Sequence, residues 1–315
     1  MSTGRQSLTR LTARFVLPLV AALALAAPGS QIAAAAPAAS PAHAVLAVGM
    51  TPQAAIDLGA AQAMRAQGVR TFASVIDRTT GRVIAQTDNA NEQVASESVV
   101  KILLAAHYLV KYDGSLPTDV DADLSEMIKY SDDAICSAYW DADGITSIAQ
   151  RYDLADTEVN PDNPGRWGGT RITAHDMASF LYQASRDPVV GPWLVRAMQS
   201  TADLGLDGFD QNFGFNSIAG LASKQGWGSD NFSDQANAVH SVGITDRYAA
   251  AVLQTGPSGT YRTMGALATN TVELLMDADP PAAPKPTPTP STAPTTASPA
   301  NLAAGVKLWL AAITF

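Results

Sequence analysis

Residues 98–106 read Ser-Val-Val-Lys-Ile-Leu-Leu-Ala-Ala, with a serine and a lysine three positions apart at the start of an apolar stretch. On a helix, residues three apart lie on the same face, so Lys101 is expected beside the hydroxyl of Ser98. The apolar residues that follow predict a buried helix, where a lysine has no surface role. The pair is therefore a candidate nucleophile and proton acceptor. For the pair taken alone, a solvent-facing helix start is the alternative.

Two further polar triplets follow later in the chain. Ser131-Asp132-Asp133 falls inside a helical stretch, and Lys224-Gln225-Gly226 closes a strand-like run just before Trp227. Each triplet has a structural alternative. The first is also typical of an N-cap followed by acidic residues in the first turn of a helix. The second is also typical of a surface turn at the end of a strand.

In this order the three strings resemble the SxxK, SDN and KTG boxes of the penicillin-recognising serine hydrolases, the family of class A β-lactamases and D,D-peptidases. The resemblance covers residues 50–276 and is greatest to the divergent β-lactamase-like envelope proteins of actinobacteria. It implies that Ser98 is the nucleophile, that Lys101 accepts its proton, and that Ser131 passes a proton to the leaving nitrogen. It also implies an oxyanion hole formed by the backbone N–H groups of Ser98 and Trp227. The implied ligand is a β-lactam or a peptidoglycan-like peptide.

The resemblance makes Asp133, Lys224, Gln225, Gly226 and Trp227 the substrate-binding residues, and two of them depart from the family pattern. Asp133 stands where the family usually has asparagine, and a carboxylate cannot donate to a substrate carbonyl but can pair with a lysine. Gln225 replaces the hydroxyl residue that normally binds a ligand carboxylate. Lys224 keeps the cation that attracts this carboxylate, and Gly226 leaves space for the ligand backbone.

The family's deacylating glutamate has only a poor match. The region 156–169 offers Asp156 and Glu158, and its many Pro, Asn and Gly residues are equally typical of a plain loop. Two hypotheses follow. The chain is either a serine hydrolase acylated at Ser98, or a non-catalytic envelope binding module on the same fold in which Asp133 and Gln225 mark lost chemistry.

The pattern of apolar residues, caps and turns predicts an α+β fold. We expect an antiparallel five-stranded sheet flanked by the terminal helices, with an all-helical insertion at 98–200. The expected elements are a helix at 52–66, strands at 71–76 and 83–85, helices through 98–199, strands at 218–227, 236–244 and 247–254, and a helix at 258–276.

The two ends have their own character. Residues 1–36 predict a secretory signal peptide, because three arginines precede an apolar run at 15–27. A β-lactamase-like domain is expected at 45–278, followed by a Pro/Thr-rich linker at 279–300. The short apolar tail at 301–315 is a candidate for association with the cell envelope, and a disordered or weakly packed tail is the alternative. These features predict a secreted or envelope-bound, extracytoplasmic protein.

Charge and residue counts exclude several functions. A formal net charge of −9 makes nucleic acid an unlikely partner for the chain, which we expect to be a monomer. The four histidines are scattered and the one cysteine, Cys136, has no partner for a disulfide, so neither a zinc site nor another cofactor is expected. There is also no GxSxG motif to present a serine to a histidine base.

Overall fold

The computed structural model describes residues 49–229, 237–257 and 259–278. The predicted signal peptide at 1–36, the linker at 279–300 and the apolar tail at 301–315 lie outside the described residues. Within the described part of the chain, no helix has both the length and the apolar character needed to cross a membrane.

Five strands form one antiparallel sheet in the order β2-β1-β7-β6-β5. Their bounds are β1 (Arg70–Asp77), β2 (Val83–Gln86), β5 (Ala222–Gly228), β6 (Asn237–Ile244) and β7 (Tyr248–Gly256). The α+β prediction with a five-stranded antiparallel sheet is confirmed. Because β5 is an edge strand, one side of it is available to the neighbouring helices.

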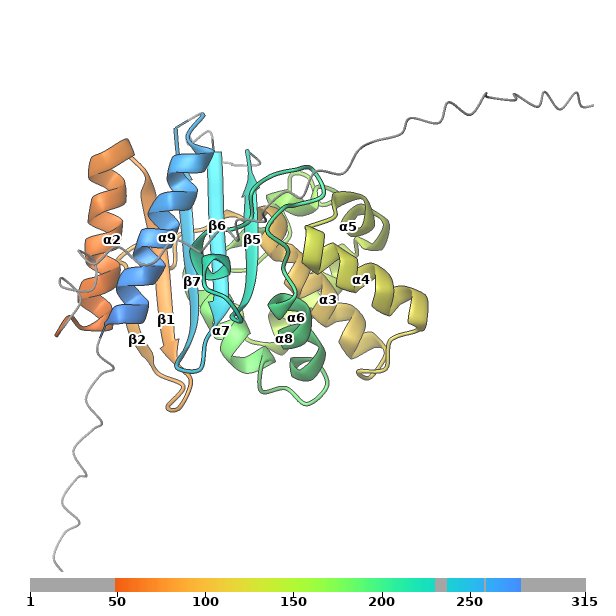
Figure 1. The fold of residues 1–315 in the computed structure, drawn as a ribbon. Coiled ribbons are helices and arrows are strands. Elements are labelled where there is room, and N and C mark those ends of the chain that lie inside the picture. The colour runs from red at the N-terminus through yellow and green to blue at the C-terminus, as the bar shows by residue number, and fades with distance from the viewer. Residues whose placement is uncertain (1–48, 230–236, 258, 279–315) are drawn as a thin grey trace, which may run out of the picture. The chain divides into compact units, whose positions relative to one another are not determined.

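The terminal helices α2 (Pro52–Gln67) and α9 (Tyr261–Asp277) lie against each other on one face of the sheet (Figure 1). Thr51 caps α2 by accepting from Ala54 N, and Gly68 ends the helix with φ of 64°. The two helices approach closely at Gly59, since a Cβ there would lie 2.5 Å from Thr271 Oγ1.

Helices also fill the middle of the chain, as expected for the insertion. They are α3 (Val100–Lys111), α4 (Thr118–Tyr130), α5 (Asp133–Tyr139), α6 (Ala142–Arg151), α7 (Ala174–Ala184) and α8 (Gly191–Gln199). One of them, α7, packs on β1 and β7 and covers the sheet face opposite the terminal helices (Figure 1). The sheet is therefore covered on one face by α2 and α9 and on the other by α7, a helix of the insertion.

The helical insertion is interrupted by a loop, which the composition of 156–169 indicated. After α6 the chain runs irregularly to the two-residue strand β4 (Arg171–Ile172), which pairs with β3 (Val94–Ala95). Proline and glycine at 161–169 explain the break, because they disfavour a continuous helix. This pairing fixes the loop beside the start of α3.

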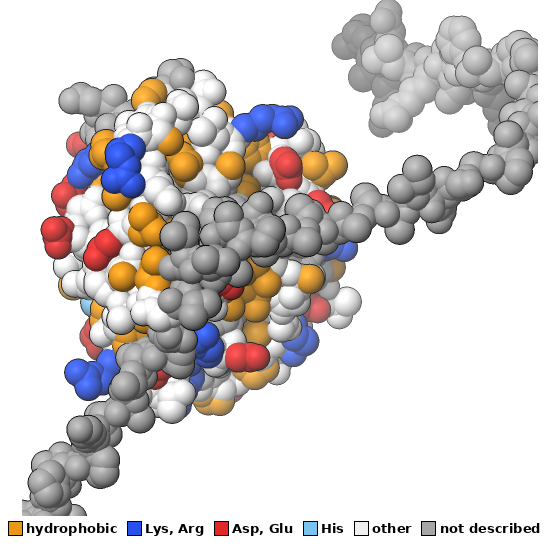
Figure 2. Space-filling view, turned by 60° about the vertical axis from the view of Figure 1, so that its left-hand side comes forward, with side chains coloured by type: hydrophobic (Ala, Val, Ile, Leu, Met, Phe, Trp, Pro, Cys, Tyr) orange, Lys and Arg blue, Asp and Glu red, His pale blue; other side chains and the backbone are white. Residues whose placement is uncertain are grey.

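Apolar side chains pack on both faces of the sheet. One cluster joins the sheet to the helices of the insertion, and a second lies beneath α2 and α9. On the face seen in Figure 2, acidic and basic side chains are interspersed among apolar ones, and no broad area of one charge is visible. The acidic side chains therefore form no cluster on the described part of that face.

Candidate active site

Ser98 lies in the short 3₁₀ turn η1 (Glu97–Val99) that leads into α3. The preceding residue, Glu97, has φ of 46°, a left-handed conformation that is costly for a residue with a side chain. Lys101 follows one helical turn later and is fully buried. Its Nζ donates to Ser98 Oγ at 2.9 Å. The structure therefore brings the two residues of the first box into hydrogen-bonding contact.

Ser131 stands at a sharp turn between two helices. It ends α4 with φ of 57°, while Asp132 caps α5 by accepting from two backbone N–H groups of the first turn. The capping role suggested for this triplet thus belongs to Asp132, which leaves Ser131 facing two lysines. Lys101 Nζ lies 2.6 Å from Ser131 O and 3.3 Å from its Oγ. Lys224 Nζ donates to the same Oγ at 2.9 Å.

Lys224 is fully buried on β5 and makes a second hydrogen bond, to the backbone oxygen of Gln225 at 2.8 Å. Burial, and then the nearby charge of Lys101, hold the pKa of Lys224 well below its ordinary value. A lowered pKa lets this amine exchange a proton with Ser131 more readily. Ser98, Lys101, Ser131 and Lys224 consequently form one continuous hydrogen-bonded chain.

Asp133 pairs with the central lysine of this chain. Its Oδ1 lies 2.6 Å from Lys101 Nζ, while 69% of the Asp133 side chain remains exposed. The same Nζ donates to Ser98 Oγ, so Asp133 competes with Ser98 for the Lys101 amine. Asp133 therefore opposes the role of Lys101 as the proton acceptor of Ser98.

Gln225 differs from its expected place. Its side chain is fully buried, and its Nε2 lies 3.4 Å from Ser241 Oγ and 3.5 Å from Phe213 O. Gln225 also stands directly across from Ser241 in the pairing of β5 with β6. The expected contact with a ligand carboxylate is corrected accordingly, because this amide points into the core and not into the cleft.

Gly226 and Trp227 complete the third box at the edge of the sheet. A Cβ on Gly226 would lie 3.1 Å from Ser96 O and 3.2 Å from Ser98 N, so only glycine allows β5 to pass this close to η1. Trp227 follows, and its Nε1 donates to Asp207 Oδ2 at 3.1 Å. The close approach brings the backbone of the third box to the nucleophile, where the resemblance places the oxyanion hole.

A cleft of about 470 Å³ opens above Ser98. Two tryptophans form part of its walls, Trp167 from the irregular loop and Trp227 from β5. Lys101 Nζ lies 4.7 Å from the centre of the Trp167 ring, and the Trp167 Nε1 donates to Ser137 Oγ at 3.1 Å. The described lining residues are Glu97, Ser98, Asp133, Ser137, Arg166, Trp167, Gly168, Asp207, Trp227, Gly228 and Ser229.

Neither carboxylate suggested for deacylation lines this cleft. Glu158 lies 2.9 Å from the Arg171 guanidinium and exchanges backbone hydrogen bonds with the same residue. The backbone N–H of Asp156 donates to Asp176, and its backbone oxygen accepts from Gln93. From this loop the described cleft receives Arg166, Trp167 and Gly168. This arrangement agrees with the poor match of the region to the family's deacylating glutamate.

Several lining residues were not identified from the sequence. Arg166 and Asp207 lie in irregular segments and Trp167 begins a short 3₁₀ helix (Trp167–Gly169), so no periodicity connects these residues with a site. For Trp167, the one available signal was a tryptophan within a Pro- and Gly-rich loop. Asp207 gave no signal, because its place beside Trp227 depends on how the segment before β5 folds back on the sheet.

Two other titratable side chains, those of His240 and Cys136, are buried in the protein interior. Burial lowers the pKa of His240 to about 4, and its Nε2 lies 2.8 Å from Ala95 O. Burial raises the pKa of Cys136 to about 12, which leaves it a poor nucleophile. Within the ranges that the structure describes, no group of three His, Cys, Asp or Glu side chains could hold a metal ion.

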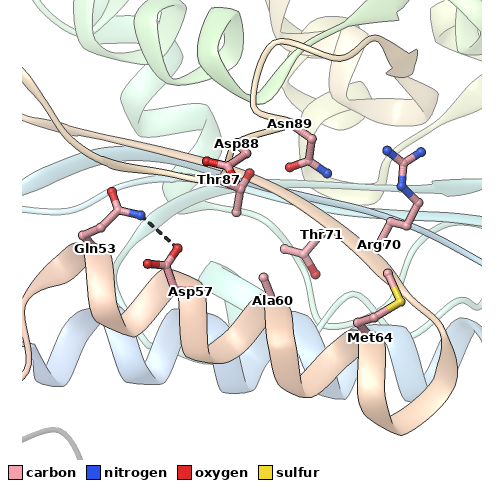
Figure 3. A pocket seen from close by; sticks show the side chains of 9 residues that line it. All are labelled: Gln53, Asp57, Ala60, Met64, Arg70, Thr71, Thr87, Asp88 and Asn89. Atoms are coloured by element: carbon pink, nitrogen blue, oxygen red, sulfur yellow. Dashed lines mark hydrogen bonds between the residues drawn. The ribbon is translucent and has the colours of Figure 1, made fainter.

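A second cavity, of about 440 Å³, lies between α2, β1 and the turn after β2 (Figure 3). Several of its polar groups already have structural partners: Gln53 donates to Asp57 and to the backbone of Gln86, and Arg70 pairs with Glu92. Its described lining residues include no serine, cysteine or lysine. The cleft above Ser98 is therefore the candidate active site.

Comparisons with known proteins agree with this geometry. No family model and no curated protein matches the sequence. Among solved structures, a class A β-lactamase from Bacteroides cellulosilyticus is 15% identical with a TM-score of 0.57, and the match covers 72% of this chain and 98% of that one. A β-lactamase from Streptosporangium roseum is 12% identical with a TM-score of 0.57, covering 70% and 96%.

A variant of PBP-A, solved as an acyl-enzyme complex with penicillin G, is 16% identical with a TM-score of 0.52 and covers 71% of this chain and 94% of that one. The class that the fold defines is thus the β-lactamase-like class. In particular, this chain has the fold shared by class A β-lactamases and PBP-A.

Proposed function

We propose that this protein is an exported active-site serine hydrolase of the penicillin-recognising type, acylated at Ser98 by a β-lactam or a peptidoglycan-like amide. The observation that carries the proposal is the hydrogen-bonded chain from Ser98 through Lys101 and Ser131 to Lys224 at the floor of a cleft. A serine and a lysine in contact match the arrangement of an activated nucleophile and its base.

In the proposed acylation, Ser98 Oγ attacks the carbonyl carbon while its proton passes to the neutral amine of Lys101. The backbone N–H groups of Ser98 and Trp227 stabilise the oxyanion. The C–N bond then breaks as Ser131 Oγ gives a proton to the leaving nitrogen, and the proton held by Lys101 restores the Ser131 hydroxyl. The short distances between these groups support such a transfer.

The proposed acyl-enzyme is long-lived. Hydrolysis requires a base that activates water beside the ester, and the irregular loop brings an arginine, a tryptophan and a glycine to the described cleft where a deacylating carboxylate would be needed. This composition favours a peptidase-like or penicillin-binding enzyme over one that turns over β-lactams efficiently.

Export and location belong to the same proposal. The arginines and the apolar run of residues 1–36 support secretion. The Pro/Thr-rich segment at 279–300 supports a stalk, and the apolar tail at 301–315 supports association with the envelope. The β-lactamase-like domain at 45–278 would then act outside the cytoplasm, as a monomer and without a cofactor, on material of the cell envelope.

A second candidate function is a non-catalytic binding module in the envelope. The observation that favours it is the ion pair between Asp133 and Lys101, with Oδ1 and Nζ 2.6 Å apart, because it engages the amine that Ser98 needs as its base. On this alternative the cleft binds a ligand without attacking it.

Incubation of the full chain with a fluorescent penicillin is expected to add one penicillin mass per molecule, and the Ser98→Ala variant is expected to add none. Intact-protein mass spectrometry measures both. The adduct should decay over hours, because the loop at 156–169 brings Arg166, Trp167 and Gly168, and no carboxylate, to the described lining of the cleft.

A Ser147→Ala variant provides the matched control, since Ser147 lies on α6 and is exposed. It should be labelled like the wild type. Absence of an adduct with penicillins, cephalosporins and an activated ester would show the hydrolase proposal to be wrong and leave the binding module. Decay within seconds would instead indicate β-lactamase turnover.

Replacement of Gly226 by alanine is expected to slow acylation by about tenfold or more, because the added Cβ presses on Ser98 N and displaces a proposed oxyanion donor. Overpacking of this kind costs about 1–3 kcal/mol of stability. The rate constant of penicillin labelling and the melting temperature measure the two effects. Gly165→Ala is the control, since nothing lies within 4 Å of a Cβ at that position. Unchanged labelling of Gly226→Ala would contradict the proposed role of the Ser98 backbone N–H as an oxyanion donor.

A further inference from the structure

The walls of the cleft are acidic where a ligand enters. Asp133 and Asp207 lie on different walls, and Glu97 contributes a third carboxylate beside Ser98. Among the described lining residues, Arg166 is the one that carries a positive charge.

Of the two lysines at the site, Lys101 offsets the charge of Asp133, its ion-pair partner at 2.6 Å. Lys101 and Lys224 are both fully buried and neither is among the residues that line the cleft. Lys224 is held beneath the surface by Ser131 Oγ and Gln225 O, at 2.9 Å and 2.8 Å. Gln225 itself faces the core. In the described cleft, the side chains of the third box therefore offer no ready donor to a ligand carboxylate.

Contacts place Asp207 at the leaving-group end of the cleft. Ser131, which faces the leaving nitrogen in the proposed acylation, is bonded to Lys224, and Lys224 Nζ lies 5.9 Å from the centre of the Trp227 ring. Trp227 in turn donates to Asp207 Oδ2 at 3.1 Å. Asp133 lies near Lys101, on the other side of Ser131. The two carboxylates consequently face different ends of a bound acyl donor.

Asp207 is also held firmly. Its Oδ1 accepts from the backbone N–H of Phe209 at 2.9 Å. The Trp227 ring stacks on Phe209, with centroids 4.5 Å apart and planes inclined by 8°. A fixed carboxylate next to a fixed indole is an arrangement that attracts a cation both by its charge and by the ring face.

Building on the proposed function, we propose that the acyl donor of this enzyme carries a positive charge at its leaving-group end, bound beside Asp207 and Trp227. The substrate class is an amide or ester whose departing part bears an ammonium group, in place of the free carboxylate that a penicillin presents there. Asp207 is the residue that determines this specificity.

Three forms of one β-lactam test the proposal. Penicillin G, its methyl ester and its 2-(diethylamino)ethyl ester carry charges of −1, 0 and +1 at the same position beside the β-lactam nitrogen. The second-order rate constant for labelling of the full chain should rise in that order, by about tenfold from anion to cation at low salt. High salt should reduce the difference.

Asp207→Asn keeps the shape and should reduce this ratio to about threefold or less. Asp210→Asn is the matched control: Asp210 is exposed in the same segment, does not line this cleft, and its Oδ1 accepts only a local backbone N–H. This variant should keep the full ratio. Equal rates for the three forms, or fastest labelling by the anion, would overturn the proposal while leaving the serine hydrolase intact.

Binding to the Ser98→Ala variant distinguishes a failure of this specificity proposal from a failure of the proposed hydrolase function. Calorimetric titration with the same three compounds needs no acylation, and dissociation constants should fall from the anion to the cation. If no compound labels the wild type but this order of binding is found, the proposed function is wrong and the specificity of Asp207 stands. If the anion binds most tightly, the proposed specificity is wrong, whether or not the proposed function is correct.

Discussion

Lys101→Met is expected to slow labelling by penicillin about 10²- to 10⁴-fold, the range of a lost general base, while the protein remains as stable as the wild type. Lys101 Nζ is the centre of the site, with contacts to Ser98 Oγ, to two atoms of Ser131 and to Asp133. Methionine fills a similar volume but cannot accept a proton, so Ser98 loses its base.

Stability should be conserved for a separate reason. Removal of a buried charge ends the cost of keeping it away from water, and replacement of an ion pair by an apolar side chain is often neutral or stabilising. Asp133, whose side chain is 69% exposed, is not left as a buried charge. The lost hydrogen bond to Ser131 O costs about 1 kcal/mol of stability. We therefore expect the melting temperature to change by no more than a few degrees.

Lys111→Met on the same helix is the control. Lys111 is exposed and lies over the rings of Tyr108 and Tyr112, away from the cleft. Labelling kinetics and thermal unfolding should both resemble the wild type. If Lys101→Met is labelled as fast as the wild type, Ser98 is activated by another group and the proposed mechanism fails.

The sheet and its covering helices could be predicted from local signals. Thr51 and Pro52 marked the start of α2, and alternating apolar runs around a Gly-containing turn marked the first hairpin. The limits of two elements were less accurate. The strand expected from 218 begins at Ala222, because Gly220 turns the chain with φ of 83°. The last helix, expected from 258, begins only at Tyr261, after Gly259 with φ of 80°.

The site was predictable only where its chemistry depends on spacing along one element. Ser98 and Lys101 are one helical turn apart, so their contact follows from the helix. The direction of Gln225 depends on its partner across β6, Ser241, which is 16 residues away. The position of Asp207 beside Trp227 depends on a segment without periodicity. Long-range pairing of this kind leaves no local trace in a single sequence.

Asp133→Asn is expected to raise the rate of penicillin labelling about tenfold to a hundredfold. The carboxylate accepts from Lys101 Nζ at 2.6 Å and so competes with Ser98 Oγ for the same amine, and its replacement by a neutral amide weakens this competition. A barrier lower by about 1.4 kcal/mol corresponds to a tenfold faster reaction. The asparagine amide can also donate to the carbonyl on the acyl side of the ligand, which a carboxylate cannot do.

Asp143→Asn is the matched control, because it makes the same change of charge at an exposed position in the first turn of α6. It should leave the labelling rate unchanged. A faster Asp133→Asn together with an unchanged Asp143→Asn would show that the ion pair restrains a complete catalytic site. A slower Asp133→Asn would contradict this and indicate that Asp133 takes the proton of Ser98 through Lys101. In that case the departure from the family pattern is a different base and not a loss of chemistry, and Asp133 serves proton transfer while Asp207 recognises a cation.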